Sequence, residues 1–486
     1  MKAFEIIMII IGAVELLNLL LLFFMIFLEK KKPQSIIAWM TILTFLPVVG
    51  FIFYILLGSG LSFRTRRMLK KKRISEKDLL EKFDWKETLA DIKLSPEIID
   101  DKEIAKFCFN KGGYPCLYND VQIFNWGLDT IKSLKKDLLN AKTSINIEYY
   151  IFANDKIGKE IMDILIKKAE EKVKVKLLYD AVGSKNTPRR FFKKLKKAGG
   201  EVAEFFPPFM HIRLINLKLN YRNHRKIVVI DGKIAYTGGV NIRDDHMGEN
   251  KRLSPWRDTH IRIEGSGVFP LQNLFFNDWR YAAKEMESTD FYINEGYFTA
   301  PQKKGSVALQ ILSSGPDSLI SEIKEAFIKL IVTAKERIYI QTPYFVPDDS
   351  FYSAIRIAKA SGVDVRLMLP KKPDKKVVYL PTLSYAKEMA DLGVKIYLYN
   401  GFLHSKTMIV DDNKLTIGTS NLDNRSFNLN FEDAVIIYSK EKNLEYEKQF
   451  AKDIKNSVEV DSTYFKKFPF LRKMGQAFYR LLSPLL

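Results

Sequence analysis

The sequence predicts an α/β protein of two homologous lobes, each a mixed sheet flanked by helices, preceded by a pair of N-terminal membrane helices. Three observations carry this prediction. Two long apolar runs open the 486-residue chain. Short runs rich in Ile, Val and Tyr then alternate with helical patterns, which is typical of α/β layers. The same series of segments also occurs twice, which indicates a duplication.

The two apolar runs cover residues 6–28 and 36–57 and are separated by the polar sequence EKKKPQS. Each is as long as the roughly 20 residues that a helix needs to cross a bilayer. A cleaved signal peptide is the poorer interpretation of the first run, because that run is too long and no small-residue cleavage site follows it. We therefore expect residues 1–60 to form a transmembrane hairpin.

Basic residues predict how this hairpin is oriented. The turn between the runs carries Lys30, Lys31 and Lys32, whereas RTRRMLKKKR (64–73) carries seven basic residues after the second run. The more basic side of a membrane protein is cytoplasmic. We therefore expect a multi-pass protein of the cell membrane whose C-terminal portion faces the cytoplasm. The two cysteines, Cys108 and Cys116, have no zinc-site spacing and suit reduced packing residues in such a compartment.

Charge narrows the class of partner. Lys and Arg number 77 against 57 Asp and Glu, which gives a formal charge of +20. Such an excess favours an anionic partner, which could be nucleic acid, an acidic membrane surface or a phosphate ester. The charge alone does not choose among these three.

The soluble portion repeats itself after a basic, mainly helical connector over 61–110. Helical patterns at 156–172 and 350–362 separate strand-like segments in both copies. We expect the first lobe over 111–300 and the second over 301–486. The matching strand-like segments are SINIEYYIFAND (144–155) with RIYIQTPYFVPDD (337–349), VKVKLLYDAVGS (173–184) with VDVRLMLPKKPD (363–374), and GGEVAEFFP (199–207) with LGVKIYLYNGF (392–402).

The sharpest repeat pairs NHRKIVVIDGKIAYTGGVN (223–241) with LHSKTMIVDDNKLTIGTSN (403–421). His and Lys stand two apart on a predicted strand, so both side chains point toward one ligand. A Gly-containing bend then returns an Asn and backbone N–H groups to the same place. The residues that recur at identical offsets are His224, Lys226, Asp231, Gly238 and Asn241 in the first copy and His404, Lys406, Asp411, Gly418 and Asn421 in the second.

This set of residues suits the transfer of a phosphodiester. One neutral imidazole can attack phosphorus, while the other, protonated, supplies a proton to the leaving alkoxide. Lysine and asparagine donors can neutralise the phosphate oxygens. A single His-x-Lys is usually structural, but two copies with the same offsets to Asp, Gly and Asn favour function over that interpretation.

At these residues the chain resembles the phospholipase D superfamily, whose mark is a doubled His-x-Lys-x4-Asp motif followed by Gly-[Gly/Ser/Thr]-x-Asn. More narrowly, it is similar to the bacterial cardiolipin synthases of that superfamily in LPVVGFIFYILLG, PWRDTHIRIEG, NLDNRSFNLNFE and RLLSPLL. The resemblance implies two lobes that share one active site. It implies that His224 is the nucleophile and His404 the general acid/base. By the same resemblance, the carboxylates that orient the two imidazoles are Asp258 and Glu432. The implied phosphate ligands are Lys226, Lys406, Asn241 and Asn421.

Within the catalytic motif, Asp231 and Asp411 stand at strand ends, and we expect them to act mainly as structural supports. The first copy has Gly239 where Ser is commoner, and the second has Thr419 there. We expect His211, His246 and His260 to be structural or close to a headgroup rather than catalytic.

The resemblance implies a membrane phosphatidyltransferase that condenses two phosphatidylglycerol molecules into cardiolipin and glycerol through a phosphohistidine. One phosphodiester replaces another, so no nucleotide is needed, and the sequence has no GxxxxGK[ST] loop. We expect no cofactor and no metal, because no His/Cys cluster has ligand spacing. The alternative is a phosphodiesterase with water as acceptor, acting on lipid or nucleic acid. The hairpin favours phosphatidylglycerol and anionic membrane lipids as partners over nucleic acid.

Two further segments mix aromatic with basic residues. The stretch 204–226 precedes the first motif and is either part of a loop and core or a lip for lipid entry. The tail over 463–486 suits a basic amphipathic helix on the bilayer surface, with Phe468, Phe470 and Leu471 as the candidate inserting residues.

Overall fold

A computed structural model describes residues 2–27, 33–58, 61, 63–72, 79, 101–208, 220–300, 302–318 and 320–481. Most of the predicted connector, the part of the aromatic and basic stretch at 209–219 that contains His211, and residues 482–486 of the tail lie outside these described residues.

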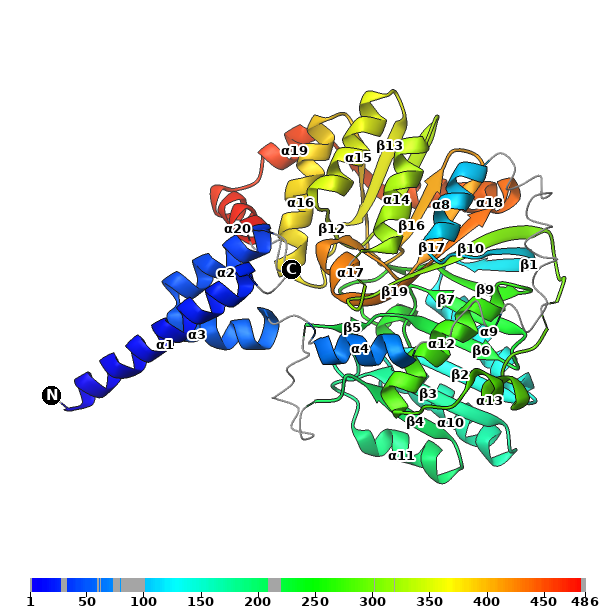
Figure 1. The fold of residues 1–486 in the computed structure, drawn as a ribbon. Coiled ribbons are helices and arrows are strands. Elements are labelled where there is room, and N and C mark those ends of the chain that lie inside the picture. Colours follow the sequence, from blue (N-terminus) through cyan, green and yellow to red (C-terminus); the bar gives the residue numbers. More distant parts are fainter. Residues whose placement is uncertain are drawn as a thin grey trace.

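The two lobes share one continuous sheet of 16 strands (Figure 1). Its order is β20-β14-β13-β11-β16-β17-β19-β10-β1-β9-β7-β6-β2-β3-β4, with β5 paired to β19. The lobes meet where β1 and β10 pair antiparallel. Read outward from that seam, β1-β9-β7-β6-β2-β3-β4 corresponds to β10-β19-β17-β16-β11-β13-β14. The predicted duplication and the mixed α/β fold are therefore confirmed.

Each lobe combines parallel and antiparallel pairs. Strands β2, β3 and β4, like β11, β13 and β14, are parallel, while the other neighbours in this strand order are antiparallel. The strands of the first lobe are β1 (Pro115–Phe124), β2 (Ser144–Tyr149), β3 (Lys174–Asp180), β4 (Glu201–Phe205), β6 (Lys226–Ile230), β7 (Ile234–Gly238) and β9 (His260–Glu264). Those of the second are β10 (Val307–Ser314), β11 (Arg337–Gln341), β13 (Asp364–Pro370), β14 (Lys395–Tyr399), β16 (Thr407–Val410), β17 (Lys414–Gly418), β19 (Asn430–Tyr438) and β20 (Ser457–Val460).

Helices cover both faces of the sheet in each lobe. On one face, apolar residues of the covering helices pack against alternate strand residues such as Ile145 and Ile147 in the first lobe and Ile338 and Ile340 in the second. A third apolar cluster joins both lobes on the other face, beneath α12 and α18. The helices are α8 (Lys102–Asn110), α9 (Gly127–Asn140), α10 (Lys156–Glu170), α11 (Arg189–Lys197), α12 (Val268–Ala283), α13 (Thr289–Asn294), α14 (Glu322–Thr333), α15 (Asp349–Ala360), α16 (Lys376–Asp391), α17 (Asn424–Asn428), α18 (Lys440–Lys455), α19 (Ser462–Lys466) and α20 (Phe470–Leu481).

Two short strand pairs connect the lobes across the seam. Strand β8 (Trp256–Arg257) pairs in parallel with β15 (Phe402–Leu403), and β5 (Arg222–Asn223) pairs in parallel with the start of β19. Each pair places a motif histidine of one lobe beside a segment of the other. The backbone N–H of His404 donates to Arg257 O at 2.7 Å, and that of His224 donates to Phe431 O at 2.9 Å. Two further short strands, β12 (Phe345–Val346) and β18 (Leu422–Asp423), pair with each other.

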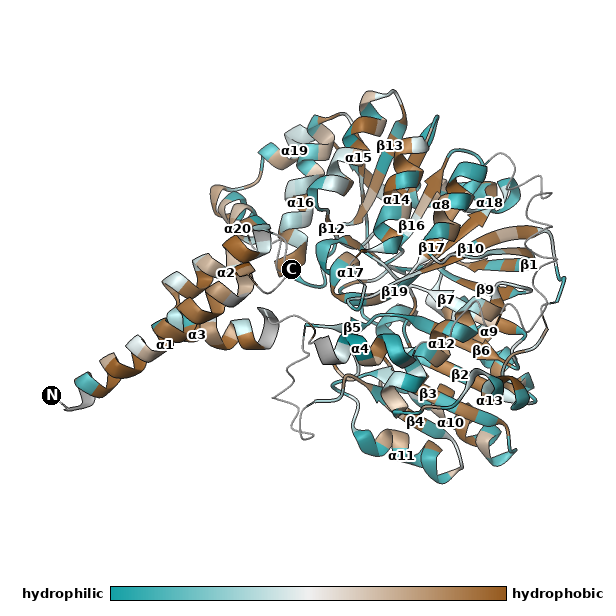
Figure 2. Cartoon of the chain, viewed as in Figure 1, coloured by the Kyte–Doolittle hydropathy of each residue, from teal (hydrophilic) through white to brown (hydrophobic). Residues whose placement is uncertain are grey.

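In the N-terminal region, the first of the two predicted membrane-crossing helices is continuous and the second is divided. Helix α1 (Lys2–Phe27) is, among the described residues, the one helix long and apolar enough to cross a membrane. The second apolar run is divided into α2 (Pro33–Phe45), α3 (Pro47–Phe53) and a π-helical turn, η1 (Tyr54–Gly58). Proline lacks a backbone N–H and its ring clashes with the preceding turn, so Pro47 begins a new helix instead of continuing the old one. These helices form an apolar arm beside the lobes (Figure 2).

Basic α4 (Phe63–Lys72) follows the arm, and amphipathic α20 closes the described chain. Phe470 and Leu471 of α20 are 74% and 80% exposed, whereas Phe468 is buried in the core of the second lobe. Phe468 therefore does not belong to the exposed apolar face that we predicted for the tail. Cys108 and Cys116 are free and buried, as predicted, and burial raises the pKa of the Cys108 thiol to about 12.

Candidate active site

The motif histidines of both copies line one cavity of about 210 Å³. His224 follows β5, and His404 follows β15, so each ring is placed at the end of a short strand that crosses the seam. Asn241 and Asn421 line the same cavity. The two copies of the motif therefore contribute to a single concave site.

The Nδ1 atom of His224 has two partners, Glu432 Oε2 at 2.9 Å and the carbonyl oxygen of Thr419 at 3.1 Å. A carbonyl oxygen can only accept, so Nδ1 carries the proton and donates it. The lone pair of this neutral imidazole is then on Nε2. Glu432 and Thr419 belong to the second lobe, so the ring of the first lobe is oriented by its neighbour.

The reciprocal arrangement holds His404. Its Nδ1 lies 2.7 Å from Asp258 Oδ2, and Asp258 comes from the first lobe. Asp258 also accepts a hydrogen bond from the backbone N–H of Thr259 at 2.8 Å. An anionic carboxylate at Nδ1 fixes the tautomer and leaves Nε2 for chemistry.

The two carboxylates differ in protonation. Burial raises the pKa of Glu432 to about 7, and nearby donors such as Lys226 and Asn430 only partly oppose this effect. Burial would also raise the pKa of Asp258, but His404, His246 and Lys406 together hold it well below its usual range. Asp258 is therefore anionic at neutral pH, whereas Glu432 is close to half protonated.

The motif lysines lie behind the cavity wall. Lys226 and Lys406 are buried, and each ammonium donates to the backbone carbonyl oxygen of the histidine two residues earlier. Burial lowers the pKa of Lys226 to about 8 and that of Lys406 to about 7. Burial and these lysine charges in turn lower the pKa of His224 well below its usual value. An anionic phosphate in the cavity would reverse these effects by balancing the lysine charge.

Asp231 and Asp411 stand away from the cavity, at the far ends of β6 and β16. Asp231 accepts hydrogen bonds from the backbone N–H groups of residues 142, 143 and 144. Asp411 accepts from those of residues 335, 336 and 337. Both backbones have a φ of 54°, the left-handed region. Each aspartate thus ties the turn after a motif strand to the start of the neighbouring strand.

Gly239 and Thr419 occupy equivalent positions but do different things. A Cβ at Gly239 would lie 1.9 Å from Asp258 Oδ1, so a residue without a side chain is required for the carboxylate to reach His404. Thr419 keeps its hydroxyl, which accepts from the N–H of Asp433 at 2.9 Å. The missing hydroxyl of the first copy is therefore a steric requirement of the site.

A third imidazole, His246, was expected from the sequence to be structural or close to a headgroup, and the structure places it in the cavity wall. It is buried in the 3-10 turn η3 (Asp244–Met247), and its ring centroid lies 5.0 Å from that of His404 in an edge-to-face arrangement. Its Nδ1 is 3.4 Å from Asp258 Oδ2. His246 stands five residues after Asn241, where the second copy has Ser426. That asymmetry between the copies was the available sequence signal.

Aromatic rings complete the wall. Tyr150 packs edge-on against His224 with centroids 4.7 Å apart, and Trp256 lies 5.4 Å from His404. Four further cations, Arg222, Arg243, Lys375 and Arg425, also line the cavity. His260, in contrast, lies in β9 outside the cavity lining, and burial lowers its pKa to about 3.

The ligand atoms of His246, Asp258 and His404 lie within 4.8 Å of one another, so this group could also hold a metal ion. The separation of 2.7 Å between His404 and Asp258 is that of a hydrogen bond. The prediction that the chain binds no metal stays a prediction.

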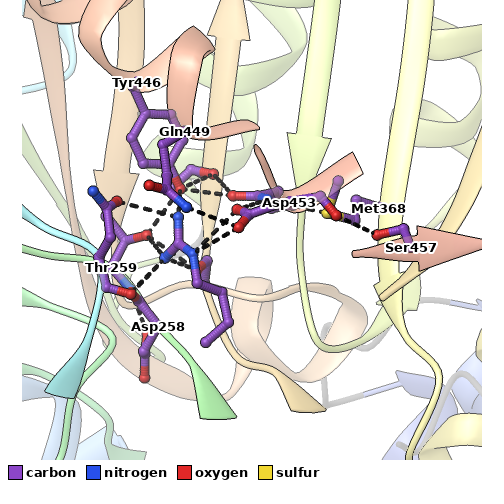
Figure 3. A network of polar contacts seen from close by, with 12 residues as sticks. Asp258, Thr259, Met368, Tyr446, Gln449, Asp453 and Ser457 are labelled. Carbon is purple, nitrogen blue, oxygen red and sulfur yellow. Dashed lines mark hydrogen bonds and ion pairs between the residues drawn. The ribbon is translucent and has the colours of Figure 1, made fainter. Parts of the chain in front are cut away.

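A buried polar network supports Asp258 from behind (Figure 3). The guanidinium of Arg257 donates to the backbone oxygen of Asp258 at 2.5 Å and to Thr259 Oγ1 at 2.9 Å. Arg257 also pairs with Asp453 of α18 at 3.1 Å. Because Asp453 is part of the second lobe, this ion pair fixes a first-lobe segment inside the second lobe. Gln449, on the same helix, donates to Asp453 at 2.9 Å.

Comparison with known protein families agrees with the duplication. Residues 134–253 and 327–454 both match the family described as "Cardiolipin synthase, PLD-like domain". Residues 16–59 match the "Phospholipase_D-nuclease N-terminal" family. The N-terminal match covers the second half of α1 together with α2 and α3.

Curated relatives extend over nearly the whole chain. A cardiolipin synthase of Listeria monocytogenes is 40% identical over 473 residues, which are 95% of this chain and 95% of the relative. Cardiolipin synthase 2 of Staphylococcus epidermidis is 40% identical over 481 residues, covering 97% of this chain and 96% of that protein. The crystal structure of phosphatidylserine synthase from Haemophilus influenzae superposes with a TM-score of 0.59 at 14% identity, covering 79% of this chain and all of that one. That likeness concerns the fold alone.

Proposed function

This chain belongs to the cardiolipin synthase family of phospholipase D-like proteins, and we propose that it condenses two phosphatidylglycerol molecules into cardiolipin and glycerol. Family membership rests on the doubled domain match and on the full-length relatives. The observation that carries the mechanism is the single cavity lined by His224 and His404, each held by a carboxylate from the opposite lobe.

In the first half-reaction, Nε2 of His224 attacks the phosphorus of one phosphatidylglycerol. The bond from phosphorus to the glycerol headgroup oxygen breaks, and the leaving alkoxide takes a proton from His404. Glycerol departs, and the phosphatidyl group stays bonded to His224. Nδ1–H of the resulting cationic ring faces Glu432, whose negative charge stabilises it.

In the second half-reaction, a glycerol hydroxyl of another phosphatidylglycerol attacks the same phosphorus. His404, now neutral, takes the hydroxyl proton, and the bond to His224 breaks. One phosphodiester is made for each one broken, so the reaction needs no nucleotide. The product is cardiolipin, and both histidines return to their starting protonation states.

We assign Lys226, Lys406, Asn241 and Asn421 to the phosphate that reacts. Positive charge in a water-poor site stabilises the charge that develops on the phosphate oxygens in the transition state. The acceptor lipid carries a second phosphate. Arg222, Lys375 and Arg425 line the remainder of the cavity and are the side chains that we assign to it.

Membrane association follows from α1 and from the family, and it brings both lipid substrates to the site. We propose that the two lobes face the cytoplasm. The segment after the apolar arm has seven basic residues in ten positions, which suits the cytoplasmic leaflet and its anionic lipids.

Purified full-length protein in vesicles of defined phosphatidylglycerol tests the reaction by mass spectrometry. Cardiolipin and glycerol in equal amounts are the expected products. Phosphatidic acid with little cardiolipin would show that water is the acceptor and would overturn the transferase assignment. The His224→Ala variant in the same vesicles serves as the blank.

A further inference from the structure

The second apolar run folds back on itself. Leu46 separates α2 from α3 with φ −133° and ψ 64°, outside the helical region. The rings of Trp39 and Tyr54 then meet edge to face with centroids 5.2 Å apart. In one straight helix, residues 15 positions apart would be separated by about 22 Å. Helix α3 therefore runs antiparallel to α2.

Glycines allow the close approach of these two helices. A Cβ at Gly50 would lie 2.9 Å from the backbone oxygen of Ile42, and a Cβ at Gly58 would lie 2.9 Å from the Trp39 ring. Small residues at such contacts let helix backbones pack tightly in a membrane. Figure 1 shows α2 and α3 side by side along α1.

The turn between α2 and α3 reaches the middle of α1 and not its far end. Asn18 Nδ2 donates to the carbonyl oxygen of Pro47 at 3.0 Å, and Asn18 is buried. Asn18 lies nine residues before the end of α1 at Phe27, a rise of about 14 Å. The hydrocarbon core is about 30 Å thick. Irregular backbone at that depth needs a polar partner within the protein, which Asn18 provides.

We propose that α1 alone crosses the membrane and that α2 and α3 form a re-entrant hairpin, inserted from the side on which the two lobes lie. The N-terminus is then outside the cell and the lobes are inside. This arrangement replaces the predicted pair of crossing helices.

Charge supports the same arrangement independently. Lys30, Lys31 and Lys32 precede α2, and the seven basic residues of 64–73 follow η1. Two crossing helices would place the three lysines outside, which gives a smaller excess of basic residues on the cytoplasmic side. A re-entrant hairpin puts all of these charges on the cytoplasmic side, while the short segment outside contains only Lys2 and Glu5 as charged side chains.

Helix α20 fits the same leaflet. Its exposed apolar side chains recur at positions of one helical face, and Arg480 pairs with Glu388 to hold the helix on α16. An amphipathic helix of this kind lies in the interface plane of a bilayer. The exposed apolar residues are Phe470, Leu471, Met474, Phe478 and Leu481.

Single cysteines test the topology in cells, in a full-length background that carries Cys108→Ala and Cys116→Ala. A membrane-impermeant maleimide should label Lys2→Cys in intact cells. It should label Lys31→Cys only after permeabilisation, like the control Glu170→Cys on the exposed end of α10. External labelling of Lys31→Cys together with protection of Lys2→Cys would overturn the proposal.

A second measurement tests the reversal itself. Cysteines at 39 and 54 should be joined by a short bifunctional thiol reagent. A pair at 39 and 9 is the control for random crosslinking, because Ile9 is exposed and lies toward the N-terminal end of α1. Absence of the 39–54 crosslink would contradict the antiparallel packing. Cardiolipin formation is measured on the same membranes. Membranes that make cardiolipin but show another labelling pattern would contradict the re-entrant hairpin and would leave the proposed reaction in place.

A different set of contacts carries a second inference. Asn241 Oδ1 accepts from the N–H of Ile151 at 3.2 Å, so its Nδ2 is a donor, and His246 Nε2 lies 3.2 Å from it. At the second ring nitrogen, the backbone N–H of Asn241 points at His246 Nδ1 at 3.3 Å, and Asp258 Oδ2 lies 3.4 Å from the same atom.

The structure assigns His246 as a positioning residue, resting on the proposed function of the site. One carboxylate, Asp258, is hydrogen-bonded to the proton-transferring His404 at 2.7 Å and lies 3.4 Å from Nδ1 of His246, whose ring also contacts the phosphate ligand Asn241. The second lobe has no counterpart, because Ser426 occupies the equivalent position.

His246→Phe tests this role, since it keeps a ring beside Trp256 and removes the polar contacts with Asn241 and Asp258. We expect kcat to fall about tenfold, KM to rise severalfold, and the pH profile to shift because Asp258 loses an imidazole that helps to keep its pKa low. His246→Gln should recover part of kcat. His260→Phe, a buried histidine outside the cavity, is the matched control and should leave the pH profile in place. An unchanged pH profile in His246→Phe would overturn the assignment. It would also be overturned if a chelator abolished the activity of the parent enzyme and Zn²⁺ restored it, because His246 would then be a metal ligand.

Discussion

The half-sites around His224 and His404 have the same residues at the same offsets, but the carboxylates that face the two imidazoles are in different states. Asp258 is held anionic by two imidazoles and a backbone N–H, whereas burial raises the pKa of Glu432 to about 7. A permanent negative charge at Nδ1 stabilises an imidazolium. Burial and the charge of Lys406 lower the pKa of His404 well below its usual value, but Asp258 opposes this lowering. We therefore assign the proton transfer to His404 and the nucleophilic attack to His224. The resemblance implied these roles, and the electrostatics of the two half-sites provides a physical reason for them.

The largest effect is expected from Asp258→Asn. Asparagine cannot stabilise a protonated His404, so kcat/KM for cardiolipin formation should fall by about 10²–10⁴-fold. The loss should be similar from pH 6 to pH 8, because Asp258 is anionic throughout that range. A loss smaller than tenfold would contradict the role of Asp258 as the carboxylate of the acid.

Gly239→Ala tests the same half-site by steric means. The added Cβ would stand 1.9 Å from Asp258 Oδ1, so the carboxylate must shift away from His404. A displacement of about 1 Å can cost about 10²-fold in rate, and we expect a loss of about 10–100-fold in kcat.

The matched control is Thr419→Ala, which keeps the backbone carbonyl that accepts from His224. It removes the hydroxyl that accepts from the N–H of Asp433 and donates to its carbonyl oxygen, a loss of about 1–2 kcal/mol of stability. If Thr419→Ala were as damaging as Gly239→Ala, the steric difference between the half-sites would have no catalytic meaning.

Glu432→Gln should have a smaller effect that depends on pH. The glutamine resembles the protonated carboxyl, which predominates below the pKa of about 7. The kcat of the variant should therefore approach that of the parent at pH 6 and fall to about one tenth of it at pH 8, where the parent has gained the negative charge. Parallel pH profiles for variant and parent would show that Glu432 is ionised throughout.

The smallest effect on activity is expected from Asp231→Asn and Asp411→Asn, made as a pair. Each aspartate accepts hydrogen bonds from three successive backbone N–H groups away from the cavity. Loss of the charge should lower the free energy of unfolding by about 1.5–3 kcal/mol, while kcat changes less than about threefold. Thermal unfolding and activity are measured together. A large loss of kcat without a loss of stability would give these aspartates a part in the chemistry.

Sequence reasoning predicted what the duplication and local patterns encode. The strands at 144–149 and 337–341 are where we predicted them, because each is a short run rich in β-branched and aromatic residues between helical segments. Asp258 and Glu432 came from the family motif, and the structure places each beside a histidine of the other lobe. That exchange depends on two short strands that cross the seam, which no local pattern reveals.

What escaped prediction depends on contacts between distant segments. His246 reaches the cavity only because η3 turns back toward β8. Phe468 has the same apolar character as Phe470, and packing alone decides that one is buried and the other exposed. In the N-terminal arm, residue composition gave the correct apolar length, but Pro47 and the glycines that allow α2 and α3 to pack decide where the helix reverses.

Identification of the covalent intermediate tests the account most directly. His404→Ala and His224→Ala variants are incubated with phosphatidylglycerol, quenched in alkali to preserve phosphohistidine, digested and analysed by mass spectrometry. The account predicts a phosphatidyl adduct on His224 in the His404→Ala variant and no adduct in His224→Ala. An adduct on His404, or equal labelling of both rings in the parent enzyme, would contradict the division of roles between the two half-sites.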